Sequence, residues 1–329
     1  MNADATSGID VSAKTLDASV LRANSDKRKR RKFSNDAPGH RQLIEWLQAF
    51  GVTRVVCEAT GVYHLDVAFA LTDAGIPLMV ANPRQVKRFI EARARNTQTD
   101  VIDADELAEY ARRMDFVPWK APSINGFELH KLGRAIGQLT KRHTAMLNRL
   151  HAARASTHTP KSIVKSAERE VQFIERERVK LSKEALRLVK ADPDLTRKFE
   201  LLVSAPGIAE VSALAILAEL IVLPPNLAGK AWVKYAGIDP MSKRSGTSVN
   251  TNAHIAKRGN ARLRGALYMP AMTARQRDPH MRDFADRMIA NHKQPIEAIV
   301  AVQRKLLLSI HAMFRTNQTW IPQPTPKTA

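Results

Sequence analysis

The chain has 329 residues, 44% of them hydrophobic, a length that allows two or three domains with buried cores. Lysine and arginine total 52 against 32 acids, and the formal net charge of +20 predicts a polyanionic partner, most often nucleic acid. The single cysteine, Cys57, excludes an internal disulfide framework and a cysteine-rich zinc site. No signal peptide is visible, and the longest apolar run, from Ala213, is too short for a bilayer span and contains Glu219. We therefore expect a soluble protein of the reducing cytoplasm with no membrane partner, although ribosome-associated and membrane-surface proteins share this charge balance.

The first part of the chain predicts an α/β domain. Ile9 and Val11 share one face of the first expected strand, and Asp10 points to the other. Several strands followed by alternating helices and strands are typical of this class. After eight residues that we expect to be disordered, the predicted elements are two strands within 8–23, a strand at 32–35, a helix at 37–51, a strand at 52–61, a helix at 64–75, a strand at 76–83 and a helix from about 100.

The middle of the chain predicts a helical coiled-coil hairpin. Apolar residues alternate at spacings of three and four in two stretches, and a break at 157–160 separates them. His143 and Arg178 interrupt the apolar seam. We expect this hairpin to take part in assembly of the protein. The alternative interpretation is an internal hairpin that only spaces the domains. The seam positions are Leu129, Leu132, Ile136, Leu139, His143, Met146 and Leu150, then Val164, Ala167, Val171, Ile174, Arg178, Leu181, Ala185 and Leu188.

The last part predicts a mostly α-helical domain. Residues 201–220 place a Pro-Gly turn between two apolar helices and resemble a helix-hairpin-helix, with Ala209 in place of the usual second glycine. A polar basic loop then leads to a helix that we expect to be kinked at Pro270, and a final amphipathic helix spans 296–314. The expected domains are 1–120, 121–195 and 196–320, with a disordered tail at 321–329.

Four acids raise the question of a metal site in this basic chain. Asp100 and Asp103 are three residues apart and share one face of a helix. Asp10 lies in a strand, and Glu58 ends a β-branched strand, at the edge where α/β folds place their chemistry. Converging carboxylates repel one another unless cations neutralise them, and oxygen ligands suit Mg²⁺ or Mn²⁺. Two such ions can stabilise both sides of a phosphoryl-transfer transition state.

Each acid also has a simpler interpretation. The helix dipole favours acids such as Asp100 and Asp103 in a first turn. Asp10 and Glu58 can be solvated residues near a turn and a strand end. The neighbouring Asp105 and Glu106 are expected to face solvent or to pair with Arg112 and Arg113.

Five motifs identify a family by their order and intervals: "GIDVSAKTLDASVL", "CEATGVY", "NTQTDVIDADELA", "KYAGIDPMSKRSGTSV" and "LRGALYMPAM". Over about residues 7–315 the chain resembles the bridge-RNA-guided transposases, or recombinases, of insertion-sequence family 110. The resemblance implies a RuvC-like, RNase H-fold domain (1–120) with an Asp-Glu-Asp-Asp site, a coiled-coil hairpin (121–195) and a C-terminal serine transposase domain (196–320). By motif, the four acids are Asp10, Glu58, Asp100 and Asp103, as catalytic residues and as ligands of Mg²⁺ or Mn²⁺.

The resemblance also implies a catalytic serine. A serine hydroxyl needs activation by a base or a metal, and Ser242, Ser245, Thr247 and Ser248 are all present in "MSKRSGTSV". The family motif aligns its nucleophile with Ser245, and Ser248 is the alternative. Ser245 would attack a DNA phosphodiester and form a 5′-phosphoserine link, with the acidic site activating the serine or stabilising the pentavalent phosphorus.

The implied partners are donor and target DNA, a structured bridge RNA that chooses the sequences, and further copies of the chain, as a dimer and as a tetramer in the synapse, in a bacterial, nucleoid-associated setting. In the family, the cooperating serine and acids come from different protomers. The residues that we expect to contact phosphates are Lys27, Arg28, Lys29, Arg30, Arg31 and Lys32, then Arg84, Lys87, Arg88, Arg93 and Arg95, and, beside the serine, Lys243 and Arg244. A solvated hairpin tip is the alternative interpretation of the first run.

Two other functions stay open on the residues alone. A hydrolytic, RuvC-like Holliday-junction nuclease would need the acids but not Ser245. A non-catalytic nucleic-acid scaffold would need neither, and its acids would only cap helices.

Overall fold

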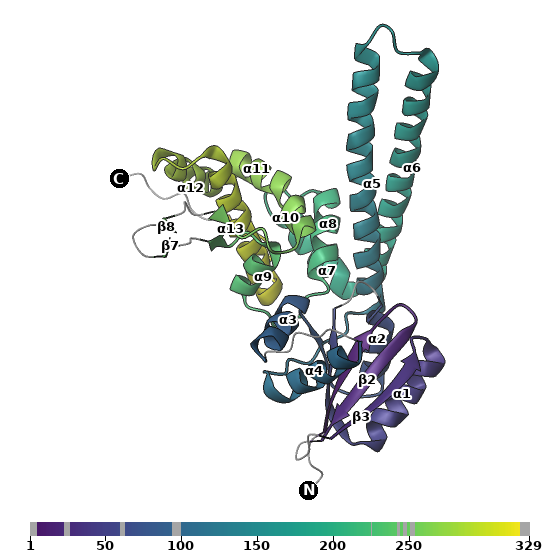
Figure 1. Cartoon of the computed structure of the whole chain (residues 1–329). Coiled ribbons are helices and arrows are strands. Elements are labelled where there is room, and N and C mark those ends of the chain that lie inside the picture. Colours follow the sequence, from purple (N-terminus) through teal and green to yellow (C-terminus); the bar gives the residue numbers. More distant parts are fainter. Residues whose placement is uncertain are drawn as a thin grey trace. The chain divides into compact units, whose positions relative to one another are not determined.

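The computed structural model describes residues 5–22, 27–59, 63–93, 100–224, 226–241, 244–245, 249–250 and 254–322, without the side chains of 100–102, 244–245 and 249–250. The chain divides into two compact units, Met1–Ala121 and Pro122–Ala329 (Figure 1). The first matches the expected α/β domain in its coarse architecture, and the second is mostly helical. The expected boundary near 195 lies within the second unit and stays a prediction. Within the described ranges, no helix has both the length and the apolar character needed to cross a bilayer.

The first unit is built on one mixed five-stranded sheet. Three antiparallel strands at one side continue into two strands that run parallel to β1, in the order β3-β2-β1-β4-β5. The expected disorder of the first eight residues is wrong for 5–8, because these residues pair with two neighbouring strands. The strands are β1 (Ala5–Val11), β2 (Thr15–Leu21), β3 (Arg28–Ser34), β4 (Val52–Glu58) and β5 (Leu78–Ala81).

The two faces of the sheet have different roles. One face is apolar and packs on α1 (Ala37–Ala49) and α2 (Leu65–Asp73), with Ile9 and Cys57 in the shared core. The other face carries α4 (Asp100–Arg113), which packs on β1, β2 and β4 beside α3 (Pro83–Ala92). Helix α3 was not among the predicted elements. Because successive strand residues alternate between faces, Asp10 lies on the α4 side, opposite Ile9.

A glycine lets α4 lie directly on the sheet. A Cβ atom at Gly8 would collide with the backbone of Ala104 and Ala108. Since a glycine inside a strand often marks a close backbone approach, Gly8 is the feature of the sequence that could have placed this helix.

The second unit begins with the predicted hairpin, formed by α5 (Ile124–Ala155) and α6 (Lys161–Ala191), which run side by side in Figure 1. All of the predicted seam positions are buried or half-buried. The two polar interruptions meet one carboxylate: His143 Nε2 lies 3.8 Å from Glu175 Oε2, and Arg178 Nη2 lies 2.7 Å from Glu175 Oε1. The knobs-into-holes packing of a coiled coil stays a prediction.

The remaining helices enclose an apolar core that also includes the base of the hairpin. The Pro-Gly turn packs closely against α11. A Cβ atom at Gly207 would collide with the carbonyl oxygen of Pro270. The likeness to a helix-hairpin-helix stays a prediction. The elements are α7 (Pro193–Ser204), α8 (Glu210–Leu220), α9 (Gly229–Ala236), α10 (Ala261–Ala266), α11 (Tyr268–Arg277), α12 (Pro279–Ala290) and α13 (Pro295–Thr316), of which α9 and α12 were not predicted separately.

The break expected from Pro270 is confirmed: the helical path changes at Leu267, between α10 and α11. Proline has no N–H to bond the carbonyl four residues earlier, that of Ala266, so it disturbs the helix just before itself. Residues 323–329 of the expected tail lie outside the described residues.

Candidate active site

Helix α4 runs antiparallel to β1 and brings its first turn to the carboxyl end of that strand. Thr6 Oγ1 donates a hydrogen bond to Ala108 O at 3.1 Å, and Gly8, two residues on, lies under Ala104. Two residues of a strand advance about 6.6 Å and four residues of a helix about 6 Å. Asp10, the next residue on this face, therefore lies below the start of α4, which begins at Asp100.

Glu58 lies beside Asp10 on the same face. The register pairs Ile9 with Cys57 on adjacent parallel strands, so Asp10 and Glu58 occupy the next level. Val56, two residues before Glu58, packs in one cluster with residues of α4. Burial first, and the charge of Asp103 second, raise the pKa of Glu58 above its ordinary value. The structure thus brings Asp10, Glu58 and Asp103 to one edge of the sheet under the N-terminal part of α4.

The chemistry of this set fits a hard divalent cation. A raised carboxyl pKa means that ionisation there is opposed, and a bound cation would remove the opposition. Among the side chains that the structure describes, no three His, Cys, Asp or Glu residues lie so that they could hold a metal ion. Asp100 is the first residue of α4, but its side chain lies outside the described part.

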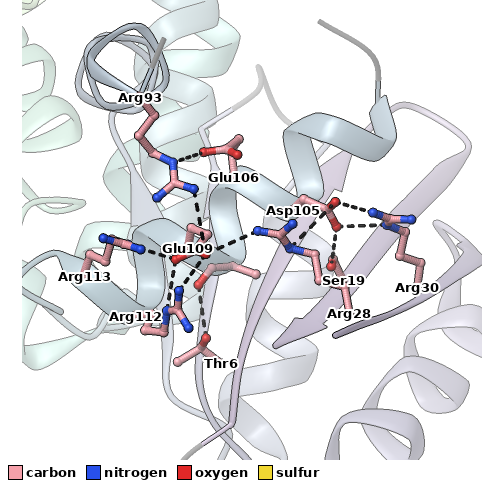
Figure 2. A network of polar contacts seen from close by, with 11 residues as sticks. Thr6, Ser19, Arg28, Arg30, Arg93, Asp105, Glu106, Glu109, Arg112 and Arg113 are labelled. Atoms are coloured by element: carbon pink, nitrogen blue, oxygen red, sulfur yellow. Dashed lines mark hydrogen bonds and ion pairs between the residues drawn. The ribbon is translucent and has the colours of Figure 1, made fainter. Parts of the chain in front are cut away.

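The prediction for Asp105 is wrong. This carboxylate is buried, and it accepts hydrogen bonds from Ser19 Oγ at 2.6 Å and from Arg30 Nε at 3.0 Å (Figure 2). Arg28 adds a third contact and a second positive charge, with its Nε 3.8 Å from Asp105 Oδ2. Burial opposes ionisation of Asp105, but the bonds from Arg30 and Ser19 and the nearby positive charges outweigh it, so its pKa is lowered. Strands β2 and β3, far away in sequence, supply all three partners.

The prediction for Glu106 is wrong as well, since this residue is fully buried and its Oε2 lies 2.8 Å from Arg93 Nε of the α3 C-cap. Arg112 and Arg113 do pair with an acid of α4, but that acid is Glu109. Their distances to its carboxylate are 2.7 Å and 3.0 Å (Figure 2). The sequence spacing predicted the arginines' role correctly and their partner incorrectly.

The first basic run forms an edge strand. Arg28 and Arg30 project to the α4 side and meet Glu109 and Asp105, and Lys32 Nζ lies 3.1 Å from Asp17 Oδ2. The solvated hairpin tip is therefore wrong for 28–32, which are all within β3. Part of the charge of this strand is used inside the protein, and its contact with phosphates stays a prediction. On α3, the second cluster is exposed at Arg84, Lys87 and Arg88.

Ser245 lies in the second unit, in a short antiparallel pair. Strand β7 (Arg244–Ser245) pairs with β8 (Val249–Asn250), and Ser245 is opposite Val249. The alternatives Ser242, Thr247 and Ser248, together with Lys243, lie outside the described residues, as do Arg95 and its neighbours 94–99.

Comparisons with known proteins agree with this layout. Residues 7–159 match a DEDD-type IS110 transposase domain, and residues 199–286 match the domain described as "Transposase IS116/IS110/IS902 family". The chain is 26% identical over 317 residues to the pilin gene-inverting protein of Moraxella bovis, covering 94% of this chain and 96% of that protein. The pilin gene-inverting protein of Moraxella lacunata matches to the same extent. An uncharacterised 43.6 kDa protein of insertion element IS110 from Streptomyces coelicolor is 33% identical over 81 residues, 25% of this chain and 20% of that protein.

Proposed function

From its place in the IS110 transposase family, which makes this chain a DNA recombinase, we propose that it cuts and rejoins DNA through a covalent link to Ser245. Asp10, Glu58, Asp100 and Asp103 would form the acidic half of the active site. The observation that supports this assignment most is the meeting of Asp10, Glu58 and Asp103 at one edge of the sheet, under the start of α4.

The covalent step is a transesterification. The Ser245 hydroxyl oxygen attacks a DNA phosphorus and loses its proton. The bond from phosphorus to the 3′ oxygen breaks, and that oxygen leaves as a 3′-OH after taking up a proton. The protein then holds the 5′ phosphate as a phosphoserine ester. A 3′-OH from the exchanged partner strand attacks this ester in the reverse sense, so one ester bond replaces another and no ATP is needed.

Asp10, Glu58, Asp100 and Asp103 are the residues that would hold Mg²⁺ or Mn²⁺. Such an ion stabilises charge that develops on phosphoryl oxygens and lowers the pKa of a bound hydroxyl. The protein's own contribution is the fixed edge: β1 and β4 hold Asp10 and Glu58 at one level, and α4 holds Asp103 above them. Burial and the charge of Asp103 raise the pKa of Glu58, and a bound cation would favour its ionised form.

The finer partners belong to the same proposal. A structured bridge RNA would select donor and target DNA, and the exposed cations of α3 and of the edge strand β3 would contact backbone phosphates. A dimer would join the serine of one protomer to the acids of another, and a tetramer would hold two DNAs. Because two relatives are named for inverting a pilin gene, inversion of a DNA segment is one outcome that such a recombinase could produce here.

The decisive experiment looks for the adduct. Protein that has been co-purified with its nucleic acid is incubated with DNA and Mg²⁺, denatured, and examined for a covalent protein–DNA species. Wild type should form the adduct, and Ser245→Ala should not. Ser248→Ala is the matched control and should keep it. An adduct that persists in Ser245→Ala and disappears in Ser248→Ala would move the nucleophile, and hydrolysis without any adduct would favour the junction nuclease.

A further inference from the structure

The segment that carries Ser245 leaves and re-enters the second unit through a closed stem. Strand β6 (Pro240–Met241) pairs antiparallel with β9 (His254–Ile255). Below this pair, Ala256 N donates to Asp239 O at 2.9 Å, and Lys257 N donates to Gly237 O at 3.0 Å. Residues 237–241 and 254–257 therefore form a continuous base for the β7–β8 pair that contains Ser245.

At the foot of the stem, two glycines let the chain segments cross in contact. Gly237 has a φ of +66°, and a Cβ there would lie 2.6 Å from the nitrogen of Gly259. A Cβ at Gly259 would in turn collide with the carbonyl of Tyr235. Side chains are thus excluded from the crossing, and the backbone bond from Asn260 N to Tyr235 O, at 2.5 Å, closes it.

A buried carboxylate sits against this crossing. Glu219 of α8 is only 3% exposed, and its Oε2 accepts a hydrogen bond from Asn260 Nδ2 at 2.6 Å. The same amide nitrogen donates to the Tyr235 hydroxyl at 2.8 Å. Arg134 of α5 lies 3.4 Å from Glu219 Oε1. Tyr235 and Asn260 are the residues on either side of the stem, so Glu219 holds one side directly and the other through Asn260.

Asn260 also caps a helix, and it uses a different side-chain atom for each of its two roles. Its Oδ1 accepts hydrogen bonds from the backbone nitrogens of Arg262 and Leu263, at 2.9 Å and 3.2 Å, and so caps α10. The cap needs only the oxygen, whereas the contact with Glu219 needs only the amide nitrogen. Arg134 faces Oε1 of Glu219, whereas Oε2 accepts its hydrogen bond from the Asn260 amide. A buried carboxylate oxygen that loses its hydrogen bond loses its hydration without compensation, so the bond to Asn260 stabilises this arrangement.

We propose that Glu219, Asn260 and Tyr235 form a positioning lock that sets the stem of the Ser245 segment for attack on DNA. The inference rests on the proposed role of Ser245. Orientation of a nucleophile matters strongly to rate, and a displacement of about 1 Å can cost about a hundredfold. The lock acts through the stem and makes no contact with DNA.

The first test is Asn260→Asp, which keeps the oxygen that caps α10 and replaces the donor to Glu219 by an acceptor. We expect the single-turnover rate of adduct formation to fall about tenfold to a hundredfold. DNA affinity should stay within about twofold, since the substitution changes the reacting position rather than binding. The helical circular dichroism should be maintained, although the melting temperature should fall because a buried hydrogen bond is lost. Loss of binding and helicity in parallel with rate would show a merely structural role and overturn the proposal.

The second test restores the bond with reversed polarity. In the double variant Glu219→Gln with Asn260→Asp, the new amide at position 219 can donate to the new carboxylate at position 260. Its rate should return most of the way to wild type, and a double variant no faster than Asn260→Asp would refute the lock. Asn317→Asp is the matched control: the same change at an exposed site, whose oxygen can still accept from Arg197, should leave the rate unchanged.

Susceptibility to trypsin does not depend on DNA cleavage, so it separates this inference from the proposed function. In the Ser245→Ala background, trypsin cleavage after Lys243 and Arg244 is followed by mass spectrometry. Asn260→Asp should speed this cleavage, and the double variant should slow it again, because a weakened stem opens more often. If Ser245→Ala keeps its adduct, the proposed function fails while this measurement still decides the lock. The three proteins compared are Ser245→Ala, Ser245→Ala with Asn260→Asp, and Ser245→Ala with the double variant. If trypsin cleaves all three at the same rate, the lock is refuted, whichever residue is the nucleophile.

Discussion

The two flanks of helix α4 carry acids of opposite electrostatic character. On the flank above β4, burial and the charge of Asp103 raise the pKa of Glu58. On the flank above β2 and β3, arginines outweigh burial and lower the pKa values of Asp105 and Glu109. Asp103, Asp105 and Glu109 lie within about two turns of α4, and Glu58 belongs to strand β4. The difference lies in the neighbouring arginines, which neutralise Asp105 and Glu109, whereas Glu58 is affected by burial and by the like charge of Asp103.

The largest expected effect is on chemistry at the first flank. Asp103→Asn should lower the rate of DNA cleavage by about a thousandfold, because a metal supplies several kcal/mol of charge stabilisation in such reactions. The fold should persist, since the substitution removes a charge that opposes ionisation of Glu58. Cleavage is measured in single turnover at saturating Mg²⁺.

A binding readout accompanies that prediction. Mg²⁺ at about ten times its dissociation constant should raise the wild-type melting temperature by about 3 °C, and EDTA should reverse the rise. Asp103→Asn should show no rise, whereas Asp105→Asn should keep it. An equal rise in Asp103→Asn would place the metal elsewhere.

The second flank should respond in stability. Glu109 is buried among Arg28, Arg93, Arg112 and Arg113. Glu109→Gln should lower the free energy of unfolding by about 3 kcal/mol, because removal of one partner leaves buried charges uncompensated. Urea denaturation measures the change.

An exposed acid provides the comparison for Glu109. The Glu200 side chain is 57% exposed and lies 3.5 Å from Arg197. Glu200→Gln should change stability by less than about 0.5 kcal/mol. Equal losses in the two variants would mean that the arginine cluster is no more than a surface network.

The smallest expected effect is on how steeply the free energy of unfolding changes with pH. The raised pKa of Glu58 means that its contribution to stability is fully present below its ordinary value of 4.5 and is lost as pH rises through the folded value. The lowered pKa of Asp105 gives a contribution that is present above its ordinary value of 3.8 and is lost as pH falls. Wild type should therefore lose stability relative to Glu58→Gln, and gain it relative to Asp105→Asn, as pH rises. Urea unfolding between pH 3 and pH 7 measures both, and parallel slopes would contradict the assignment.

Sequence patterns predicted most of the architecture. The alternation at Ile9, Asp10 and Val11 correctly placed Asp10 on the face opposite the apolar core, and the spacing of three and four correctly predicted the hairpin of α5 and α6. Such patterns depend on local periodicity, which short windows of sequence contain. Helix α3 was missed because its basic residues were interpreted only as phosphate contacts, although Asn82 and Pro83 are typical of a helix start. The change of path at Leu267 was predicted from Pro270.

The candidate site was predicted only in part. Motif resemblance selected Asp10, Glu58, Asp100 and Asp103 from 32 acids, and the structure has Asp10, Glu58 and Asp103 at one edge of the sheet, where the charge of Asp103 acts on Glu58. The resemblance did not indicate that Asp105 and Glu106, next to these acids in the sequence, are buried and paired with arginines. The resemblance also did not indicate a role for Glu219. This acid lies among apolar residues of α8, and its hydrogen-bond partner, Asn260, is 41 residues away in the sequence.

By itself, then, the sequence determined the partner class, the elements and the order of the motifs, because charge, periodicity and turn residues act locally. Only the tertiary structure decided which acids are neutralised. Asp105 is bonded to Ser19 and Arg30, 86 and 75 residues away, and such contacts exist only after the strands have paired and α4 has settled over Gly8. Electrostatic environment depends on distance in space, and a linear pattern contains no such distance until the chain folds.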